Sequence, residues 1–264
     1  MVEYSISDIA EILNISKEMV RYYEKCGVIR PKRSTTNNYR VYTTMDLFQL
    51  GEAIQLTRFD INIKQTTTLK EGNFVEKLLA NYIEFYKKLD QEIQYDELLK
   101  QRCLEMIERT EMSALNLNNF WVKKIPEQYA YCSFQAKGDN YKKISASKEI
   151  GQWFLSSKYG VFSDSVVEFK KNDDQWFFCI DKKYADILKP PINGERIESP
   201  LKTCLCTIID MGEMGLFNRE KIEPMIKRAE GMHYKVTGNI QGVLCGRGVI
   251  DGKFRRYMEL RLPI

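Results

Sequence analysis

The sequence predicts a multidomain chain that combines α and α+β structure. Two short amphipathic helix patterns open the chain, one long helical pattern without proline fills residues 73–110, and strand patterns take over from Trp121. A length of 264 residues fits one large domain or two to three smaller ones, and 44% hydrophobic residues are enough for a core. We expect three domains, at residues 1–72, 73–112 and 120–264.

The first expected element is a helix-turn-helix. Ser5 and Asp8 have the spacing of a capping box, and apolar residues then recur at helical spacing as far as Leu13. A second helix can begin after the cap residue Ser16 and end at Gly27, because glycine adopts the left-handed conformation that ends many helices. Two short helices joined by a tight turn form the skeleton of a helix-turn-helix.

The second helix is expected to have one face toward the protein and one toward a nucleic acid. At 100° per residue, the apolar side holds Met19, Val20, Tyr23 and Cys26, whereas Arg21 lies in a cationic stripe with Lys17 and Lys25. Tyr22 lies at the boundary, with its hydroxyl free to reach outward. The cationic face is the one that could enter a major groove.

A basic hairpin, or wing, is expected after this helix. Residues 17–40 hold seven Lys or Arg against two Glu, although the net charge of the whole chain is only +4. Alternation over Tyr39–Tyr42 indicates a small hairpin, and Asn37 and Asn38 tolerate positive φ at its tip. Such a hairpin is well placed to hold phosphates, although a basic segment taken alone is more often a solvated face.

The order of these motifs resembles the N-terminal domain of the MerR family of transcription regulators. The segments that carry the resemblance are YSISDIAEILNIS, VRYYEKCGVIRPKR, NNYRVYTTMDL and LFQLGEAIQLTRFDINIKQ. Asn38 departs from the family's glycine, and Arg58-Phe59-Asp60 from its Leu-Gly-Phe. The resemblance implies binding to double-stranded promoter DNA and an indirect effect on RNA polymerase. The expected DNA-contact residues are Lys17, Arg21, Tyr22, Arg33, Tyr39, Arg40 and Arg58.

A long helix is expected over residues 73–110. Apolar residues there step by three and four, as in a coiled-coil seam, which Asp96 and Lys100 interrupt before Cys103 and Ile107 resume it. A helix packed on a core would show a similar short period. The MerR resemblance favours the coiled coil, and it implies a homodimer whose two long helices pair in antiparallel orientation. The first part of this seam consists of Leu79, Tyr82, Tyr86, Leu89 and Ile93.

The seven cysteines indicate reduced thiols in a cytoplasmic protein. Their number is odd and their spacing fits no disulfide framework, and we interpret the close pair Cys204 and Cys206 as buried thiols. Residues 73–102 hold no cysteine, which disfavours metal or redox sensing, since soft-metal sites need several thiolates. We therefore expect no metal and no cofactor. No apolar run is long enough to span a bilayer, so no membrane partner is expected.

The last 145 residues predict two successive strand-helix-strand-strand units, which suggest an internal duplication. Pro224 lies in the first turn of the second helix or kinks it. A Pro-rich connector, residues 188–200, separates the units. The first is expected as a strand at 121–136, a helix at 145–160 and strands at 161–169 and 175–181. The second is expected as a strand at 201–209, a helix at 218–232 and strands at 243–250 and 253–264.

This order resembles the GyrI-like domain, the effector-binding half of multidrug-responsive MerR regulators. The resemblance implies a groove between the two units that holds a hydrophobic small molecule, often a cation. In VTGNIQGVL, Gln241 takes the place of the family's acid and offers no charge to offset a cation. Glu259 is either a solvent-facing strand residue or a replacement for that acid. The expected effector-contact residues are Tyr159, Phe217, Gln241, Tyr257 and Glu259, and core packing would also explain the two lone aromatics, Tyr159 and Phe217.

Together the two resemblances imply a dimeric, ligand-responsive activator of transcription that is not an enzyme. Two alternatives stay open. One is a GyrI-like small-molecule hydrolase fused to a DNA-binding domain, although the sequence has no Ser/His/Asp or Cys/His spacing to support catalysis. The other is a DNA-binding protein that responds to no ligand.

Overall fold

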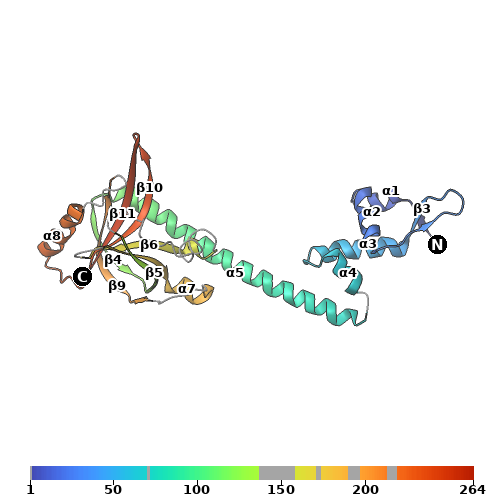
Figure 1. Cartoon of the computed structure of the whole chain (residues 1–264), viewed down its shortest axis with the longest axis horizontal. Helices are drawn as coiled ribbons and strands as arrows, with labels where there is room; N and C mark the ends of the chain where they lie inside the picture. The colour runs from blue at the N-terminus through green and yellow to red at the C-terminus, as the bar shows by residue number, and fades with distance from the viewer. Residues whose placement is uncertain (1, 70–71, 137–157, 171–173, 190–196, 213–218) are drawn as a thin grey trace. The chain divides into compact units, whose positions relative to one another are not determined.

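The computed structural model describes residues 2–69, 72–136, 158–170, 174–189, 197–212 and 219–264 (Figure 1). The chain divides into two compact units, Met1–Gln94 and Tyr95–Ile264. The long helix α5, Phe74–Leu115, contributes residues to both. The predicted fold class, a winged helix-turn-helix followed by a long helix and a mixed α/β domain, is confirmed.

The first unit begins with the winged helix-turn-helix. Its sheet has three strands in the order β1-β3-β2, and Lys32 pairs with Val41 while Arg33 pairs with Arg40 in the hairpin. In chain order its elements are β1 (Glu3–Tyr4), α1 (Ile6–Ile12), α2 (Lys17–Lys25), β2 (Lys32–Arg33), β3 (Arg40–Thr43), α3 (Thr44–Thr57) and α4 (Ile63–Leu69), followed by the first part of α5.

Local sequence signals set the ends of these helices. Ser5 and Asp8 form both hydrogen bonds of the predicted capping box at the start of α1. The hydroxyl of Ser16 accepts a hydrogen bond from the backbone N–H of Met19 at the start of α2, as the sequence predicts. Gly27 follows α2 with φ of 80°, a conformation that glycine adopts at little cost.

Asn38 and Asp60 both lie in segments where the sequence departs from the MerR pattern. Each adopts a left-handed backbone conformation, with φ of 61° and 62° respectively. Asparagine and aspartate tolerate this region better than other residues with a side chain, because their short polar groups bond locally. The departure at Asn38 is therefore compatible with a turn that glycine would also allow. Asp60 stands one residue after Phe59, which takes the glycine position of the second segment.

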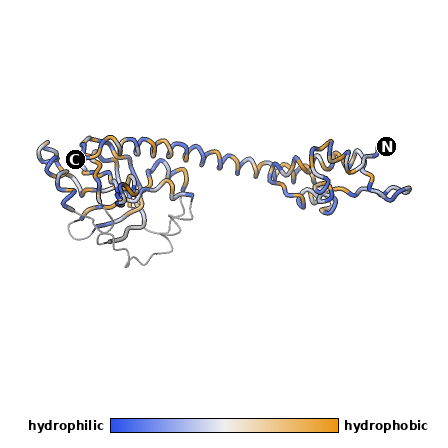
Figure 2. Tube along the Cα trace, turned by 90° about the horizontal axis from the view of Figure 1, so that it is seen from above, coloured by the Kyte–Doolittle hydropathy of each residue, from blue (hydrophilic) through white to orange (hydrophobic). Residues whose placement is uncertain are grey.

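Helix α5 is 42 residues long and extends to Leu115, beyond the predicted end. Apolar residues recur along it (Figure 2). Within the first unit, the ring of Phe59 packs against Tyr82 at 5.0 Å between centroids, and Lys88 Nζ lies 2.6 Å from Asp60 Oδ2. These contacts join the turn after α3 to the first part of α5. Tyr82, which was predicted in the seam, therefore packs within its own unit.

The second unit is built on one sheet of eight strands in the order β4-β9-β11-β10-β6-β7-β5-β8, and every pairing is antiparallel. Its strands are β4 (Phe120–Ile125), β5 (Gln128–Ala136), β6 (Ser163–Glu168), β7 (Asp174–Asp181), β8 (Ile197–Ser199), β9 (Lys202–Asp210), β10 (Gln241–Ile250) and β11 (Lys253–Pro263). The helical segments are η2 (Gly160–Phe162), α7 (Lys182–Leu188), η3 (Arg219–Ile222) and α8 (Glu223–Gly231).

The strand order supports the predicted duplication. Counted outward from the neighbouring pair β6 and β10, one half runs β6-β7-β5 and the other runs β10-β11-β9. In each half the strand that comes second in the sequence lies innermost, followed by the third and then the first. Helix α8 covers the second half, where Met225 and Ala229 join a core with Leu260. Nearly all of the helix predicted at 145–160 lies outside the described residues.

The structure differs from the sequence prediction for this unit at two places and decides between the two alternatives for Pro224. The single strand expected over 121–136 is two strands, because Pro126 has no N–H for a ladder; β4 pairs with β9 and β5 with β7. Helix α7 and strand β8 were not predicted. Pro224 lies in the first turn of α8, so it begins the helix instead of kinking it.

Candidate nucleic-acid interface

The two faces of α2 lie as the sequence predicts, except at Met19, which is 43% exposed. Val20 is fully buried and Tyr23 is 4% exposed, and both pack into the core of the first unit with Ile9 and Leu50. On the other side the side chain of Arg21 is 57% exposed. Its nearest ionic partner, Glu18, lies 3.6 Å away and is itself exposed, so water screens the pair and Arg21 is available to a ligand.

A cavity of about 510 Å³ brings together three of the predicted DNA-contact residues, Arg21, Tyr39 and Arg40. It lies where α2 meets the hairpin β2–β3. Tyr39 is 73% exposed, which leaves both its ring and its hydroxyl accessible. The lining of the cavity also includes one acid, Glu3. The two guanidinium groups outnumber that acid, and with the phenol they suit an anionic, partly planar partner such as a nucleic-acid backbone with its bases.

Arg40 has a role that sequence reasoning missed. Its Nε donates to both carboxylate oxygens of Glu24 at 2.9 Å, so the hairpin is tied to the end of α2. These hydrogen bonds, with the charge of Glu24, raise the pKa of Arg40 above its ordinary value. The sequence did contain a signal for this pair, because Glu24 in the predicted helix and Arg40 in the predicted wing carry opposite charges.

The other predicted contact residues are exposed but do not line this cavity. Tyr22 is 50% exposed, and its ring meets the buried Tyr23 edge to face at 6.2 Å. Arg33 donates from Nη1 to the backbone carbonyl of Asn38 at 3.1 Å, which supports the hairpin tip. Lys17 opens α2, and Arg58 caps the end of α3.

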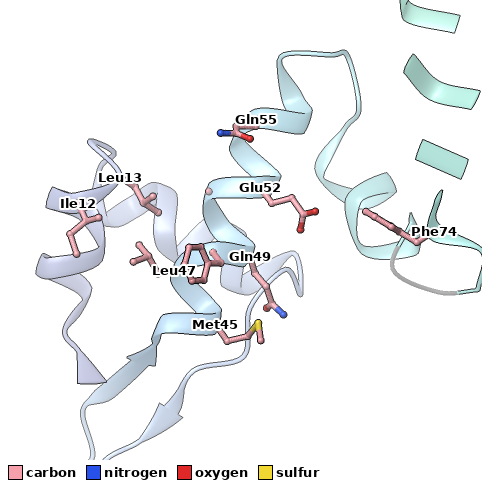
Figure 3. A pocket seen from close by; sticks show the side chains of 10 residues that line it. Ile12, Leu13, Met45, Leu47, Gln49, Glu52, Gln55 and Phe74 are labelled. Atoms are coloured by element: carbon pink, nitrogen blue, oxygen red, sulfur yellow. The ribbon is translucent and has the colours of Figure 1, made fainter. Parts of the chain in front are cut away.

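A second hollow of the first unit is apolar. It has a volume of about 830 Å³ and lies between α1, α3 and the start of α5, where Ile12, Met45 and Phe74 contribute side chains (Figure 3). Glu52 is the one charged residue among those that line it. This groove is therefore unsuited to phosphate, and the cationic cavity beside α2 is the better nucleic-acid candidate.

In the second unit, the register of β10 and β11 brings three predicted effector contacts to one face of the sheet. Gln241 pairs with Arg261 and Val243 with Glu259, and residues two apart on a strand share a face. Gln241 and Tyr257 are half-buried, and Glu259 is 3% exposed. The solvent-facing alternative for Glu259 is wrong, because its side chain is buried.

Glu259 is paired within the protein. Arg261 Nε donates to Glu259 Oε1 at 2.7 Å, and Lys123 Nζ lies 3.6 Å from Oε2. Burial alone would raise the pKa of Glu259, but the charges of Arg261 and Lys123 hold it below the ordinary value. Its negative charge is therefore already compensated, and it is a poor replacement for an acid that would face a cation.

Of the two aromatic residues predicted to contact the effector, the structure describes one. Tyr159 is half-buried and packs against the aromatic cluster that contains Phe162 and Tyr184, with Lys158 Nζ 5.7 Å from its ring centroid. This surrounding supports core packing for Tyr159. Phe217 lies outside the described residues.

Sequence reasoning also missed an ion cluster that joins α5 to β6. Arg109 donates from both Nη atoms to Asp164 at 2.7 and 2.8 Å, and Arg102 donates to the same carboxylate at 2.7 Å. Burial alone would raise the pKa of Asp164, but the hydrogen bonds and charges of the two arginines hold it well below its usual range. The sequence contained a signal for this cluster, because two arginines seven residues apart share a helix face.

Burial makes two of the described thiols unreactive. Burial raises the pKa of Cys179 and of Cys206 to about 12, so both are protonated at neutral pH and unreactive. Cys204 and Cys206 are buried, as predicted. Within the described parts of the chain no group of His, Cys, Asp and Glu could hold a metal ion, and no helix is long and apolar enough to cross a membrane.

Residues 4–72 match the family model of the MerR HTH family regulatory proteins. The transcriptional regulator CueR of Escherichia coli O157:H7 is 31% identical over 65 residues, which are 25% of this chain and 48% of CueR. YyaN of Bacillus subtilis strain 168, a regulator of the same HTH type, is 34% identical over 86 residues, 30% of this chain and 57% of its own. The chain thus spans about half the length of these curated relatives.

Two solved structures are also similar, at low identity. The cryo-EM structure of an EcmrR–DNA complex aligns over 98% of both chains with 18% identity and a TM-score of 0.39. The crystal structure of the EcmrR C-terminal domain covers 55% of this chain and 96% of its own, with 15% identity and a TM-score of 0.41. Likenesses of this strength carry no argument about function. The family match covers the winged helix-turn-helix at residues 4–72.

Proposed function

We propose that this chain is a transcription regulator that binds double-stranded promoter DNA through α2 and the hairpin β2–β3. The observation that carries the proposal is the cationic cavity, where Arg21 of the second helix and Arg40 of the wing meet in an exposed hollow. The match of residues 4–72 to MerR HTH regulatory proteins supports it independently. The effect on RNA polymerase would be indirect, through the shape of the promoter.

The regulator would act as a homodimer held by α5. Leu79, Tyr86, Leu89, Ile93 and Ile107 follow the predicted seam, and each is between 42% and 68% exposed. An exposed apolar stripe of this kind is costly to leave in water, even interrupted at Asp96 and Lys100, and usually marks an interface. Burying it against α5 of a second copy would set two helix-turn-helix domains on one palindromic site.

The C-terminal unit would bind a hydrophobic small molecule. The expected site lies on the sheet face that carries Gln241 and Tyr257. Gln241 is uncharged and Glu259 is compensated by Arg261 and Lys123, so this face offers little to stabilise a buried cation. We therefore expect an uncharged or anionic hydrophobic effector in preference to a cationic one.

Activation would follow from distortion of the promoter. Bending or untwisting DNA over a site of this size costs several kcal/mol, which multiple Lys and Arg contacts to phosphate can offset. The effector would change transcription only through its different affinity for the two shapes of the dimer. Arg102 and Arg109 of α5, bound to Asp164 of β6, are a direct mechanical link from sheet to helix within the second unit.

The test is footprinting with in-vitro transcription on the promoter of the chain's own gene. The full-length protein is assayed alone, with a neutral aromatic compound and with a cationic dye of similar size. We expect a protected palindrome, with transcript increased by the neutral compound more than by the dye. No protection would overturn the regulator, protection with no response to either compound would favour a ligand-independent DNA-binding protein, and consumption of a compound would favour the hydrolase.

A further inference from the structure

The seam of α5 carries two opposite charges at its middle. Asp96 and Lys100 lie in line with the exposed apolar residues Leu89 and Ile93 before them and Ile107 after them. Both charged residues are exposed, and neither takes part in an ion pair among the residues that the structure describes. Nothing within the described chain explains why an apolar stripe is broken by one acid and one base, four residues apart.

The opposite side of the same helix is already used. On that side Leu98 packs against the aromatic cluster of the second unit, and Arg102 and Arg109 bind Asp164. Leu99, at the flank of the seam, packs against the same cluster. At 100° per residue, Arg102 and Arg109 lie more than 100° from Asp96 and Lys100 around the helix. The seam therefore faces away from the sheet, and its polar residues are free to meet another chain.

We propose that α5 pairs with α5 of a second copy in antiparallel orientation, with the two-fold axis beside residue 98, so that Asp96 of each protomer faces Lys100 of the other. The inference rests on the proposed homodimer and adds its register. In an antiparallel coiled coil, a positions of one helix face d positions of the other. With this axis, Ile93 faces the partner's Cys103 and Leu89 faces the partner's Ile107.

Other registers leave the charges without partners. A shift of one heptad in one direction places Asp96 against the partner's Ile93 and Lys100 against the partner's Leu89. The opposite shift places Asp96 against Ile107 and Lys100 against Cys103. Each buries a charge beside an apolar residue or a thiol, which is costly. Parallel pairing is also disfavoured, because it places Asp96 beside Asp96 and Lys100 beside Lys100.

The pair would act mainly by excluding wrong registers. A polar residue at a seam position commonly specifies register and orientation at some cost in affinity. Here two symmetric pairs form in one register and are broken in the others. The apolar residues on either side would supply most of the affinity, and the Asp96–Lys100 pairs would select which of them meet.

Sedimentation equilibrium of full-length charge-reversal variants tests the register. Asp96→Lys and Lys100→Asp should each raise the dimer dissociation constant about tenfold, because each replaces two attractive pairs with two repulsive ones. The double variant D96K/K100D should return within about twofold of the parent, since both pairs re-form with reversed sign. Glu84→Lys makes the same charge change on an exposed position away from the seam and should leave the constant unchanged.

Cysteine cross-linking gives an independent readout. Under mild oxidation, Ile93→Cys should form an interchain disulfide to the partner's Cys103, which peptide mapping identifies, and Cys103→Ser should abolish it. A disulfide between the two introduced thiols at position 93 would indicate parallel pairing and overturn the proposal. A dimer that neither charge reversal weakens would overturn the register and leave the homodimer standing. A chain that is monomeric at every concentration would overturn both.

Discussion

At the scale of single residues, the two neighbouring tyrosines of α2 have different surroundings. Tyr22 is 50% exposed, whereas Tyr23 is 4% exposed and packs in the core. Consecutive helix residues are separated by 100°, so adjacent side chains of the same type can serve a core and a surface. The helical period was enough to separate them, and the same reasoning correctly put Arg21 on the outer side.

Replacing Arg21 with alanine should weaken binding to the operator by about 1–3 kcal/mol if the guanidinium contacts a base edge in the major groove. Fluorescence anisotropy with the footprinted DNA measures the change. Lys235→Ala removes an exposed cation from the other unit and serves as the control. Operator affinity equal to that of the parent would show that Arg21 does not contact DNA.

Glu259 shows where residue-level prediction ends. Its strand and its face followed from alternation along β11, but its burial and its partner did not. Both depend on β9 and β10 flanking β11, which brings Lys123 of β4 within 3.6 Å of its carboxylate. Such strand neighbours are set by pairing across long sequence separations, which a local pattern does not contain.

At the scale of elements, helices were predicted more closely than strands. The caps of α1 and α2 are local hydrogen bonds between residues three apart, so their sequence signature is specific. The error over 121–136 arose because an alternating pattern continues on both sides of Pro126, while the chain there moves from one end of the sheet to the other. Helix α7 was missed because it is short, with Tyr184 and Ala185 as its buried residues.

The link between α5 and β6 predicts a large effect on stability. Asp164→Asn would leave Arg109 and Arg102 buried without a full counter-charge, and breaking a buried pair in this way costs about 3–5 kcal/mol. Urea unfolding of the full chain measures the loss. Asp251→Asn, in the exposed turn between β10 and β11, is the matched control and should change stability little. A loss below about 1 kcal/mol for Asp164→Asn would place the link among screened surface pairs.

At the scale of the whole molecule, DNA binding and dimerisation should be coupled through α5. A dimer that holds two half-sites binds far more tightly than one helix-turn-helix domain, because the second contact is intramolecular. The apolar seam and the cationic cavity belong to the same chain but to different elements. Weakening the seam should therefore weaken operator binding without any change at the DNA-contact residues.

This coupling can be measured with Asp96→Lys. Its operator affinity should fall at low protein concentration and recover as concentration rises, since mass action restores the dimer. The variant D96K/K100D should bind as the parent does at all concentrations. Anisotropy titrations at several total protein concentrations measure the effect. A loss of affinity that is independent of concentration would mean that Asp96 acts on the DNA contact itself and not on assembly.

The sequence by itself determined the local elements of this protein: the capped helices, the exposed face of α2, the start and apolar period of α5, and the repeated order of strands. Each depends on interactions between residues within a few positions of one another. Only the tertiary structure decided that Glu24 binds Arg40, that Asp164 binds two arginines of α5 and that Glu259 is compensated by Arg261 and Lys123. Except for Glu259 with Arg261, these pairs join residues far apart in sequence or on different elements. The burial that strengthens the pairs of Asp164 and of Glu259 with their arginines is set by the neighbours that folding supplies.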